Sequence, residues 1–439
     1  MHDLEAVSRY RRVLECIRAH GMEPNVTLWH FVHPTWFEEA GGWAQEDNVP
    51  AFVDYARRCF EWFGPQVKLW ATLNEPTCYA FVGHVLGVGP PGRLLDLAGA
   101  GRVLSSLLRA HSAAYAAIKA LPGGADAQVG LVNHHLSFEP LGKGVLYLLA
   151  KLASDWLSYL WGWDVMERWL LTGRFEWAPV PGVRLSWEHP SGRPPCDWWG
   201  INYYTSACVC SWSLQSACRP GQRMTDMGYP LSAEGMYRCI KRCSTYGMPL
   251  YVTETGVADA RDDQRAAMIQ SYMAAVLRAM EEGCDVRGVY YWTLVDSLEW
   301  CLGYTMKFGL YAWEPDGSVD RVLREGSKAL VRFFAALPDS LQAARQAARQ
   351  VRTLLLRQRD PAGGEQQEQA RGPQAATQAG AGAGARAGVG ASSRRGAGVG
   401  GRTGEQVVAQ LLRLALEGLM ALLRGWRAAG TGRAASAAA

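Results

Sequence analysis

Hydrophobic and polar positions along the chain follow two alternating patterns, one with the period of a helix and one of short apolar runs. Residues 3–20 have apolar side chains every three or four positions, and Gly21 ends the segment, as glycine often ends a helix. Residues 25–31 (NVTLWHF) then form a run typical of a buried strand. The same order repeats. Helices are predicted at 3–20, 49–63, 102–121, 155–171, 232–246, 262–282 and 324–337, and strands at 25–31, 67–73, 128–138, 198–205, 250–253 and 286–294.

This alternation predicts a parallel β-sheet of six strands, because strands separated by helices form βαβ units. The predicted strands are apolar on both faces, as a sheet covered on both sides requires. Residues suited to chemistry follow the carboxyl ends of the strands, as at Glu75, Tyr204 and Glu254. Side chains gathered at one end of every strand favour an (α/β) barrel over an open sheet, whose site lies at a single switch point.

The end of the chain differs in composition from the rest. The net charge of the whole chain is +4, yet residues 341–439 carry 14 Arg against five acidic residues, so the part before them is acidic. We therefore expect a barrel domain at 1–340 that binds no nucleic acid. Residues 341–404 are predicted to be a disordered low-complexity linker, followed by an amphipathic helix at 405–427 and a disordered tail at 428–439. The helix is a candidate for weak contact with a membrane or a partner.

The eleven cysteines show no spacing typical of a disulfide framework. Cys239 and Cys243 form a close pair, but no second pair follows at zinc-site spacing. We expect reduced thiols, a cytoplasmic location, no metal site and no cofactor. The His134–His135 pair is interpreted first as rim or packing residues and second as ligands. The apolar run at 144–161 is interrupted by charged residues, so it is not predicted to span a membrane.

Two short strings carry the candidate chemistry, and each places a glutamate where a predicted strand gives way to Pro or Gly. TLNEP at 72–76 contains Glu75, and YVTETG at 251–256 contains Glu254. A carboxylate just past the carboxyl end of a buried parallel strand lies in the shared mouth of a barrel. Two facing carboxylates can split a glycosidic bond, since one protonates the leaving oxygen and the other attacks or stabilises the sugar carbon.

At these strings the chain resembles glycoside hydrolase family 1, the retaining β-glycosidases of the β-glucosidase type. TLNEP is similar to the family's acid/base segment, and VTETG to its nucleophile segment, where Thr255 replaces the usual Asn. VTLWH at 26–30 and GINYY at 200–204 match two further strand ends in the family's order. The resemblance covers about residues 3–337.

The resemblance implies a small-molecule β-glycoside substrate, with Glu75 as acid/base and Glu254 as nucleophile. It implies sugar-site roles for His30, Asn74, Asn202, Tyr204, Trp292, Glu299, Trp300 and Phe308. Glu254 has to be ionised to attack, so it needs donors such as the Tyr204 hydroxyl. Glu75 has to hold a proton, so burial and a nearby negative charge are expected to raise its pKa. A carboxylate at Glu299 would repel a phosphorylated sugar.

The chain also departs from the family pattern. Members begin with two more βα units, which carry a Gln that grips the sugar and an Arg beside the nucleophile, and neither residue has a counterpart here. We therefore expect a (β/α)8 barrel that is incomplete at its N-terminus, with about six βα units and two unpaired strand edges. The simplest hypothesis is that the sequence is part of a longer protein, with Met1 an internal methionine. The alternative is a short product of low stability or activity.

Three functions remain open at this point. The first is hydrolysis of a terminal β-D-glucosyl or related residue by a two-step retaining mechanism. The second is transfer of the glycosyl group to a sugar or glycolipid acceptor instead of water, because the family includes a galactolipid-processing branch. The third is a remnant that binds without catalysis, which the missing units favour. Glucose versus galactose preference, the aglycone and the oligomeric state do not follow from the sequence.

Overall fold

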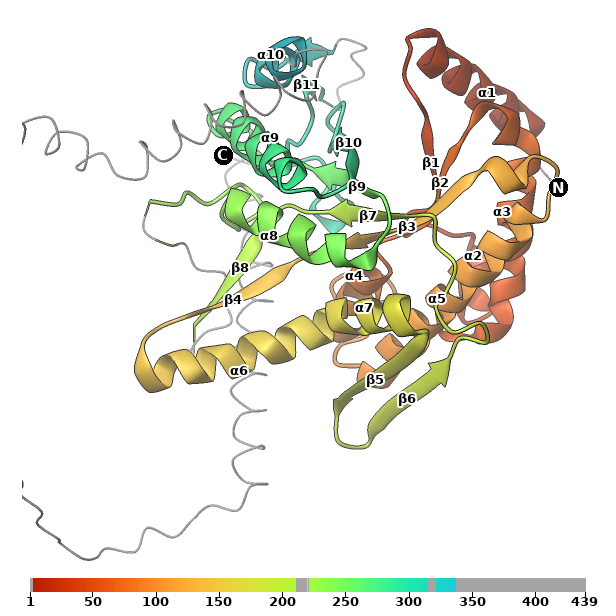
Figure 1. Cartoon of the computed structure of the whole chain (residues 1–439), viewed down its shortest axis with the longest axis horizontal. Coiled ribbons are helices and arrows are strands. Elements are labelled where there is room, and N and C mark those ends of the chain that lie inside the picture. The colour runs from red at the N-terminus through yellow and green to blue at the C-terminus, as the bar shows by residue number, and fades with distance from the viewer. Residues whose placement is uncertain (1–2, 211–218, 220, 315–320, 337–439) are drawn as a thin grey trace, which may run out of the picture.

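The structure is a computed structural model, and it describes residues 3–210, 219, 221–314 and 321–336. The predicted linker at 341–404, amphipathic helix at 405–427 and tail at 428–439 lie outside the described residues. In the described part, a curved parallel sheet is surrounded on its outer face by helices (Figure 1).

The central sheet has six strands in the order β1-β2-β3-β7-β9-β10, and every neighbouring pair is parallel. This confirms the predicted barrel-type sheet of six strands. Its strands are β1 (Asn25–Trp29), β2 (Leu69–Asn74), β3 (Gln128–His134), β7 (Trp198–Asn202), β9 (Leu250–Thr255) and β10 (Val286–Tyr291). Because all six run the same way, their carboxyl ends lie at one rim of the sheet, where both candidate glutamates follow.

Long helices connect these strands and cover the outside of the sheet (Figure 1). They are α1 (Leu4–Ala19), α3 (Val49–Phe63), α5 (Leu97–Lys119), α6 (Gly144–Trp161), α7 (Trp163–Thr172), α8 (Ala233–Cys243), α9 (Arg265–Glu281) and α10 (Lys328–Ala336). Two short α-helices, α2 (Thr35–Glu39) and α4 (Pro76–Ala80), follow the ends of β1 and β2. Smaller strands are β4 (Ser137–Leu141), β5 (Arg174–Val180), β6 (Val183–Glu188), β8 (Ser206–Cys210), β11 (Tyr311–Ala312) and β12 (Val322–Leu323). Among the described residues, side-chain caps begin three of the long helices: Asp3 caps α1, Asp96 caps α5 and Ser232 caps α8.

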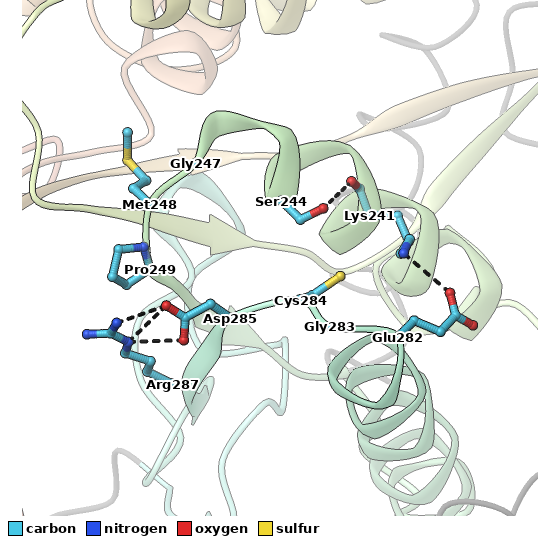
Figure 2. A pocket seen from close by; sticks show the side chains of 10 residues that line it. All are labelled: Lys241, Ser244, Gly247, Met248, Pro249, Glu282, Gly283, Cys284, Asp285 and Arg287. Atoms are coloured by element: carbon cyan, nitrogen blue, oxygen red, sulfur yellow. Dashed lines mark hydrogen bonds and ion pairs between the residues drawn. The ribbon is translucent and has the colours of Figure 1, made fainter.

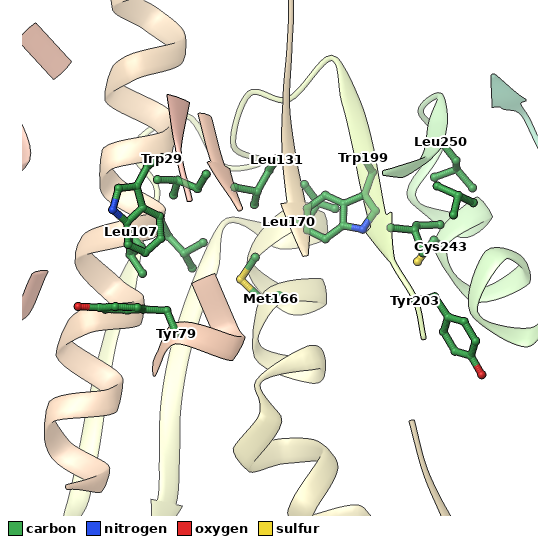
Figure 3. Close-up of a cluster of buried hydrophobic side chains, with 14 of the residues drawn as sticks. Trp29, Tyr79, Leu107, Leu131, Met166, Leu170, Trp199, Tyr203, Cys243 and Leu250 are labelled. Carbon is green, nitrogen blue, oxygen red and sulfur yellow. The ribbon is translucent and has the colours of Figure 1, made fainter. Parts of the chain in front are cut away.

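The main core lies between the outer face of the sheet and the helices. Leu131 of β3 and Trp199 of β7 belong to the same buried cluster as Leu107 of α5 and Met166 of α7 (Figure 3). A much smaller cluster on the inner face contains Leu69, Ala71, Val132 and Trp198. Burial on both faces explains why the central strands read as unbroken apolar runs in the sequence.

Three segments differ from the predicted elements. The helix predicted at 155–171 is two helices, because Gly162 takes a left-handed φ of 86° between α6 and α7. The strand predicted at 128–138 ends at His134, and β4 then leaves the sheet to pair with β8. The antiparallel hairpin of β5 and β6 was not predicted. Its β6 shows a strict alternation of exposure, which is the pattern of a surface strand.

The two outer strands of the six leave the sheet open in the described part of the chain. Among the described residues, β1 pairs only with β2, and β10 only with β9. Thr27 in the middle of β1 is exposed, whereas every residue of β2 and β7 is buried. At the carboxyl rim the two edges still approach each other, since the His30 ring lies 5.8 Å from that of Trp292. Residues that follow the two edge strands therefore come together at the candidate site, although the edge strands themselves do not pair.

Helix α6 begins with exposed apolar side chains, which are Val145, Leu146, Tyr147, Leu148 and Leu149. Lys151 and Asp155 form an ion pair at 2.7 Å farther along the same helix. In the described ranges, no helix combines the length and the apolar character that crossing a bilayer demands.

Candidate active site

Glu75 lies directly after β2 in a backbone conformation that few non-glycine residues adopt. Its φ is 47°, in the left-handed region, and Pro76 then begins α4. The Glu75 N–H donates to the Val132 carbonyl of β3 at 2.9 Å, which ties the turn to the neighbouring strand. Such strained backbone is typical of functional positions. The turn holds the Glu75 side chain at the rim, where it is 7% exposed.

Asn202 at the end of β7 connects the two candidate glutamates. Its Nδ2 donates to Glu75 Oε1 at 2.8 Å and to Asn74 Oδ1 at 3.0 Å. Its Oδ1 accepts from the Thr253 hydroxyl at 2.7 Å, and its backbone lies opposite Glu254 in the β7–β9 register. The rim thus brings together Asn74 and Glu75 at the end of β2, Asn202 of β7 and Glu254 of β9.

Glu254 follows Thr253 near the end of β9 and accepts a hydrogen bond from the Tyr204 hydroxyl at 2.7 Å. Burial raises the pKa of Glu254 well above its ordinary value, and the neighbouring Glu75 adds to the rise, whereas Tyr204 and Asn202 oppose it. Sequence reasoning expected a raised pKa at Glu75 and an ionised Glu254. The pKa rise at Glu254 favours its protonated form, which differs from the expected ionised state.

No cation balances this charge within the described residues. Neither Glu75, Glu254 nor Glu299 forms an ion pair with a Lys or Arg there. The groups that oppose the rise in the pKa of Glu254 are the neutral donors Tyr204 and Asn202.

His30 and Asn74 extend the hydrogen-bonded row toward β1. Asn74 Nδ2 donates to His30 Nε2 at 3.1 Å. Burial lowers the pKa of His30, and the negative charge of Glu75 only partly opposes this effect. His30 is therefore neutral near pH 7 and offers one donor and one acceptor.

Trp292, Glu299 and Trp300 lie on the segment after β10, opposite His30. The rings of Trp292 and Trp300 each lie 5.8 Å from the His30 ring, and Trp300 is 44% exposed. Burial and, secondarily, Glu75 raise the pKa of Glu299 to about 7. These residues frame the space above the rim with two flat apolar rings and one acceptor.

Phe308 is placed differently from the other predicted sugar-site residues. It is only 4% exposed, and its ring lies 5.9 Å from that of Tyr204 in an edge-to-face arrangement. It offers little free area to a sugar in this structure and instead supports the tyrosine that donates to Glu254.

Two residues that lie beside the candidate catalytic groups were not predicted from the sequence to be part of the site. Cys78 lies in the first turn of α4, and its thiol sulfur lies within 4.8 Å of a Glu75 carboxylate oxygen. His134 ends β3 with its ring 5.8 Å from that of Tyr204. The available signal was position alone, because Cys78 follows Glu75 by three residues on a helix and His134 ends a strand.

A hollow of about 440 Å³ lies at the other end of the sheet and is a poor candidate for the site. Pro249 and Asp285 in its lining precede β9 and β10, so it opens at the amino ends of the strands (Figure 2). Its charged groups are already paired, Lys241 with Glu282 at 3.4 Å and Arg287 with Asp285 at 2.9 Å. In barrel enzymes the chemistry lies at the opposite, carboxyl end.

The parallel sheet and the carboxylates at its carboxyl rim define a barrel-type glycosidase. The family model "Glycosyl hydrolase family 1" matches residues 3–176 and 188–337. The chain belongs to this family, and it is a glycoside hydrolase of the β-glucosidase type.

Individual relatives agree with this assignment. A β-galactosidase of Pyrococcus woesei is 30% identical over 75% of this chain and 72% of its own length. β-Glucosidase A of Thermotoga maritima is also 30% identical, over 69% of this chain and 71% of its own. The solved Thermotoga maritima β-glucosidase in complex with deoxynojirimycin has a TM-score of 0.66 at 25% identity, and the match covers 77% of this chain and 80% of that one.

Glu299 is expected to make stability depend on pH. Its pKa rises from about 4.5 unfolded to about 7 folded, so the folded protein binds the extra proton. The resulting stabilisation is complete below the unfolded pKa and is lost as pH rises through about 7. We expect the difference in melting temperature, Glu299→Gln minus the parent, to increase as the pH is raised from 5 to 8. Thermal unfolding at each pH measures this difference.

Exposed Glu39 provides the control, because Glu39→Gln should shift the melting temperature equally at both pH values. A constant difference between Glu299→Gln and the parent across this range would show that Glu299 titrates as an ordinary glutamate.

Proposed function

We propose that this chain hydrolyses β-glycosides with a terminal β-D-glucosyl or related residue by a retaining double displacement. Glu254 acts as nucleophile and Glu75 as acid/base. The observation that carries the proposal is the Asn202 side chain, which bonds Glu75 at 2.8 Å while its backbone lies opposite Glu254. Asn202 thus lies on a strand between those that carry Glu75 and Glu254, an arrangement that supports the carboxylate pair of a retaining mechanism.

In the first step, the Glu254 carboxylate attacks the anomeric carbon as the bond to the leaving oxygen breaks. Glu75 transfers its proton to that oxygen, and a covalent glycosyl ester forms on Glu254. In the second step, Glu75 takes a proton from water, whose oxygen attacks the same carbon and releases Glu254. The cycle needs one proton, which Glu75 carries at the start of the first step and regains from water in the second.

The remaining residues suit the binding of a pyranose ring. Asn74 is uncharged and can donate to a 2-hydroxyl, a contact that strengthens in the transition state. His30 and Glu299 can exchange hydrogen bonds with other ring hydroxyls, and Trp300 offers an exposed ring face. Glu299 disfavours phosphorylated sugars, since a carboxylate repels phosphate.

The test is hydrolysis of 4-nitrophenyl β-D-glucoside and β-D-galactoside, with the first-formed sugar followed by proton NMR. We expect the β-anomer to appear first and to mutarotate afterwards. Initial release of the α-anomer would exclude a retaining mechanism. The two substrates are both needed because the relatives carry both the glucosidase and the galactosidase name.

Tyr204→Phe is expected to lower kcat by about 10- to 100-fold, because a hydrogen bond to a charged group contributes about 1.5–3 kcal/mol. The variant removes only the hydroxyl that donates to Glu254 at 2.7 Å. Tyr10→Phe is the matched control, since Tyr10 is 63% exposed on α1. Equal kcat in Tyr204→Phe and the parent, measured by steady-state kinetics, would remove Tyr204 from the proposed mechanism.

A further inference from the structure

Three side chains of metal-binding types meet at the acid/base end of the site. Glu75, Cys78 and His134 each present one ligand atom, and these atoms all lie within 4.8 Å of one another. Glu75 and Cys78 come from the turn at the start of α4, whereas His134 ends β3. No zinc spacing appears in the sequence because the donors come from two separate segments.

The distances suit a single cation. Zinc lies about 2.0–2.3 Å from oxygen, nitrogen and sulfur ligands, so donors around one tetrahedral ion lie about 3.3–3.8 Å apart. The three donor atoms lie within 4.8 Å of one another, so a contraction of at most about 1.5 Å brings them to this spacing. Carboxylate, thiolate and imidazole are all zinc ligands, and three of them leave a fourth position for water.

His134 has an unused nitrogen in this cluster. Its Nε2 is buried and has no hydrogen-bond partner within the described chain. The rings of Trp161 and Tyr204 lie edge-to-face against it at 5.1 and 5.8 Å, which holds the imidazole in place. A buried nitrogen without a partner is costly, and coordination of this nitrogen by an ion would remove that cost.

The charge around the cluster also favours a dication. Glu254 and Glu299 lie close enough to act electrostatically on Cys78 together with Glu75. Within the described residues, none of these carboxylates is paired with a Lys or Arg. A divalent cation placed among them would relieve their mutual repulsion.

We propose that Glu75, Cys78 and His134 form an inhibitory site for a thiophilic divalent cation, represented by Zn²⁺. Binding releases two protons to solvent, one from the Cys78 thiol and one from the Glu75 carboxyl group, and leaves the metal coordinated by the carboxylate, thiolate and imidazole. Glu75 then cannot pass a proton to a leaving oxygen, so hydrolysis stops. Inhibition rests on the proposed role of Glu75, whereas binding does not.

The binding test is calorimetric titration of the full chain with Zn²⁺. A second buried group, His135, Cys239 and Cys243, also gathers its ligand atoms within 4.8 Å, so every protein carries Cys239→Ser. In that background we expect Cys78→Ser and His134→Gln each to weaken zinc binding at least tenfold. The control Cys16→Ser should leave it unchanged, because Cys16 is exposed on α1.

Circular dichroism spectra that match the parent show that each variant folds, and Cys78→Ala repeats the test with a smaller side chain. Unchanged zinc affinity in folded Cys78→Ser and His134→Gln would overturn the site. A folded chain that binds zinc through these residues but splits no glycoside would keep the site and overturn the proposed function.

The activity test asks whether zinc and catalysis share Glu75. We expect Zn²⁺ to inhibit aryl glucoside hydrolysis, a chelator to restore it, and Cys78→Ser to need at least tenfold more zinc for the same inhibition. Inhibition that is equally strong in Cys78→Ser and the parent would overturn the inhibitory role.

Discussion

Glu254→Ala is expected to abolish nearly all turnover, with kcat lower by on the order of 10⁴-fold or more, as for other enzymes that lose a nucleophile. Without a carboxylate beside the anomeric carbon, no glycosyl ester can form. Steady-state hydrolysis of an aryl β-glucoside measures the loss. A residual kcat within tenfold of the parent would contradict the proposed role.

Added azide separates the roles of the two glutamates. In Glu254→Ala, azide enters the space left by the nucleophile and attacks the anomeric carbon directly, so we expect an α-glycosyl azide. In Glu75→Ala, Glu254 still forms the ester and azide replaces water, so we expect a β-glycosyl azide. The anomers are distinguished by NMR, and reversed outcomes would exchange the two assignments.

Arg265→Leu is expected to lower the free energy of unfolding by about 3–5 kcal/mol, the cost of breaking a buried charged network. Arg265 at the start of α9 is fully buried and forms an ion pair with Asp262 at 2.7 Å. Its guanidinium also donates to the carbonyls of Asp259 and Phe308, both at 3.0 Å. It therefore joins the loop after β9 to the segment after β10, and its loss leaves buried carbonyls without a donor.

Urea unfolding measures this effect, and Arg261→Leu is the matched control because the Arg261 side chain is 70% exposed. We expect the control to change the free energy of unfolding by less than about 0.5 kcal/mol. If Arg265→Leu were equally mild, the network would not hold the rim together. Catalysis should fall along with stability in Arg265→Leu, since Phe308 supports Tyr204.

Much of the fold follows from local pattern. The six strands of the sheet read as apolar runs because burial on both faces leaves no room for polar residues, and α3, α5, α8 and α9 show the helical period. The break at Gly162 was missed because apolar residues continue on both sides of it. The departure of β4 to pair with β8 was missed for a similar reason, since no local signal tells a strand which neighbour it will join.

The candidate site was predictable to the extent that its residues follow strand ends. Glu75, Asn202 and Glu254 lie at one rim because parallel strands share a direction. Phe308 was expected to contact sugar but is buried against Tyr204, and Cys78 and His134 were not expected beside Glu75. Burial and contact depend on segments distant in sequence, which a motif does not describe.

By itself, the sequence determined which segments form the six central strands, the end of the sheet that carries the carboxylates and the family. These depend on periodicity and on short strings within one segment. Only the tertiary structure decided how the charge is shared at the rim: it buried Glu254 beside Glu75, raised the pKa of Glu254 and left both carboxylates without an ion-paired Lys or Arg among the described residues. Protonation depends on distance and burial in three dimensions, so no single segment encodes it.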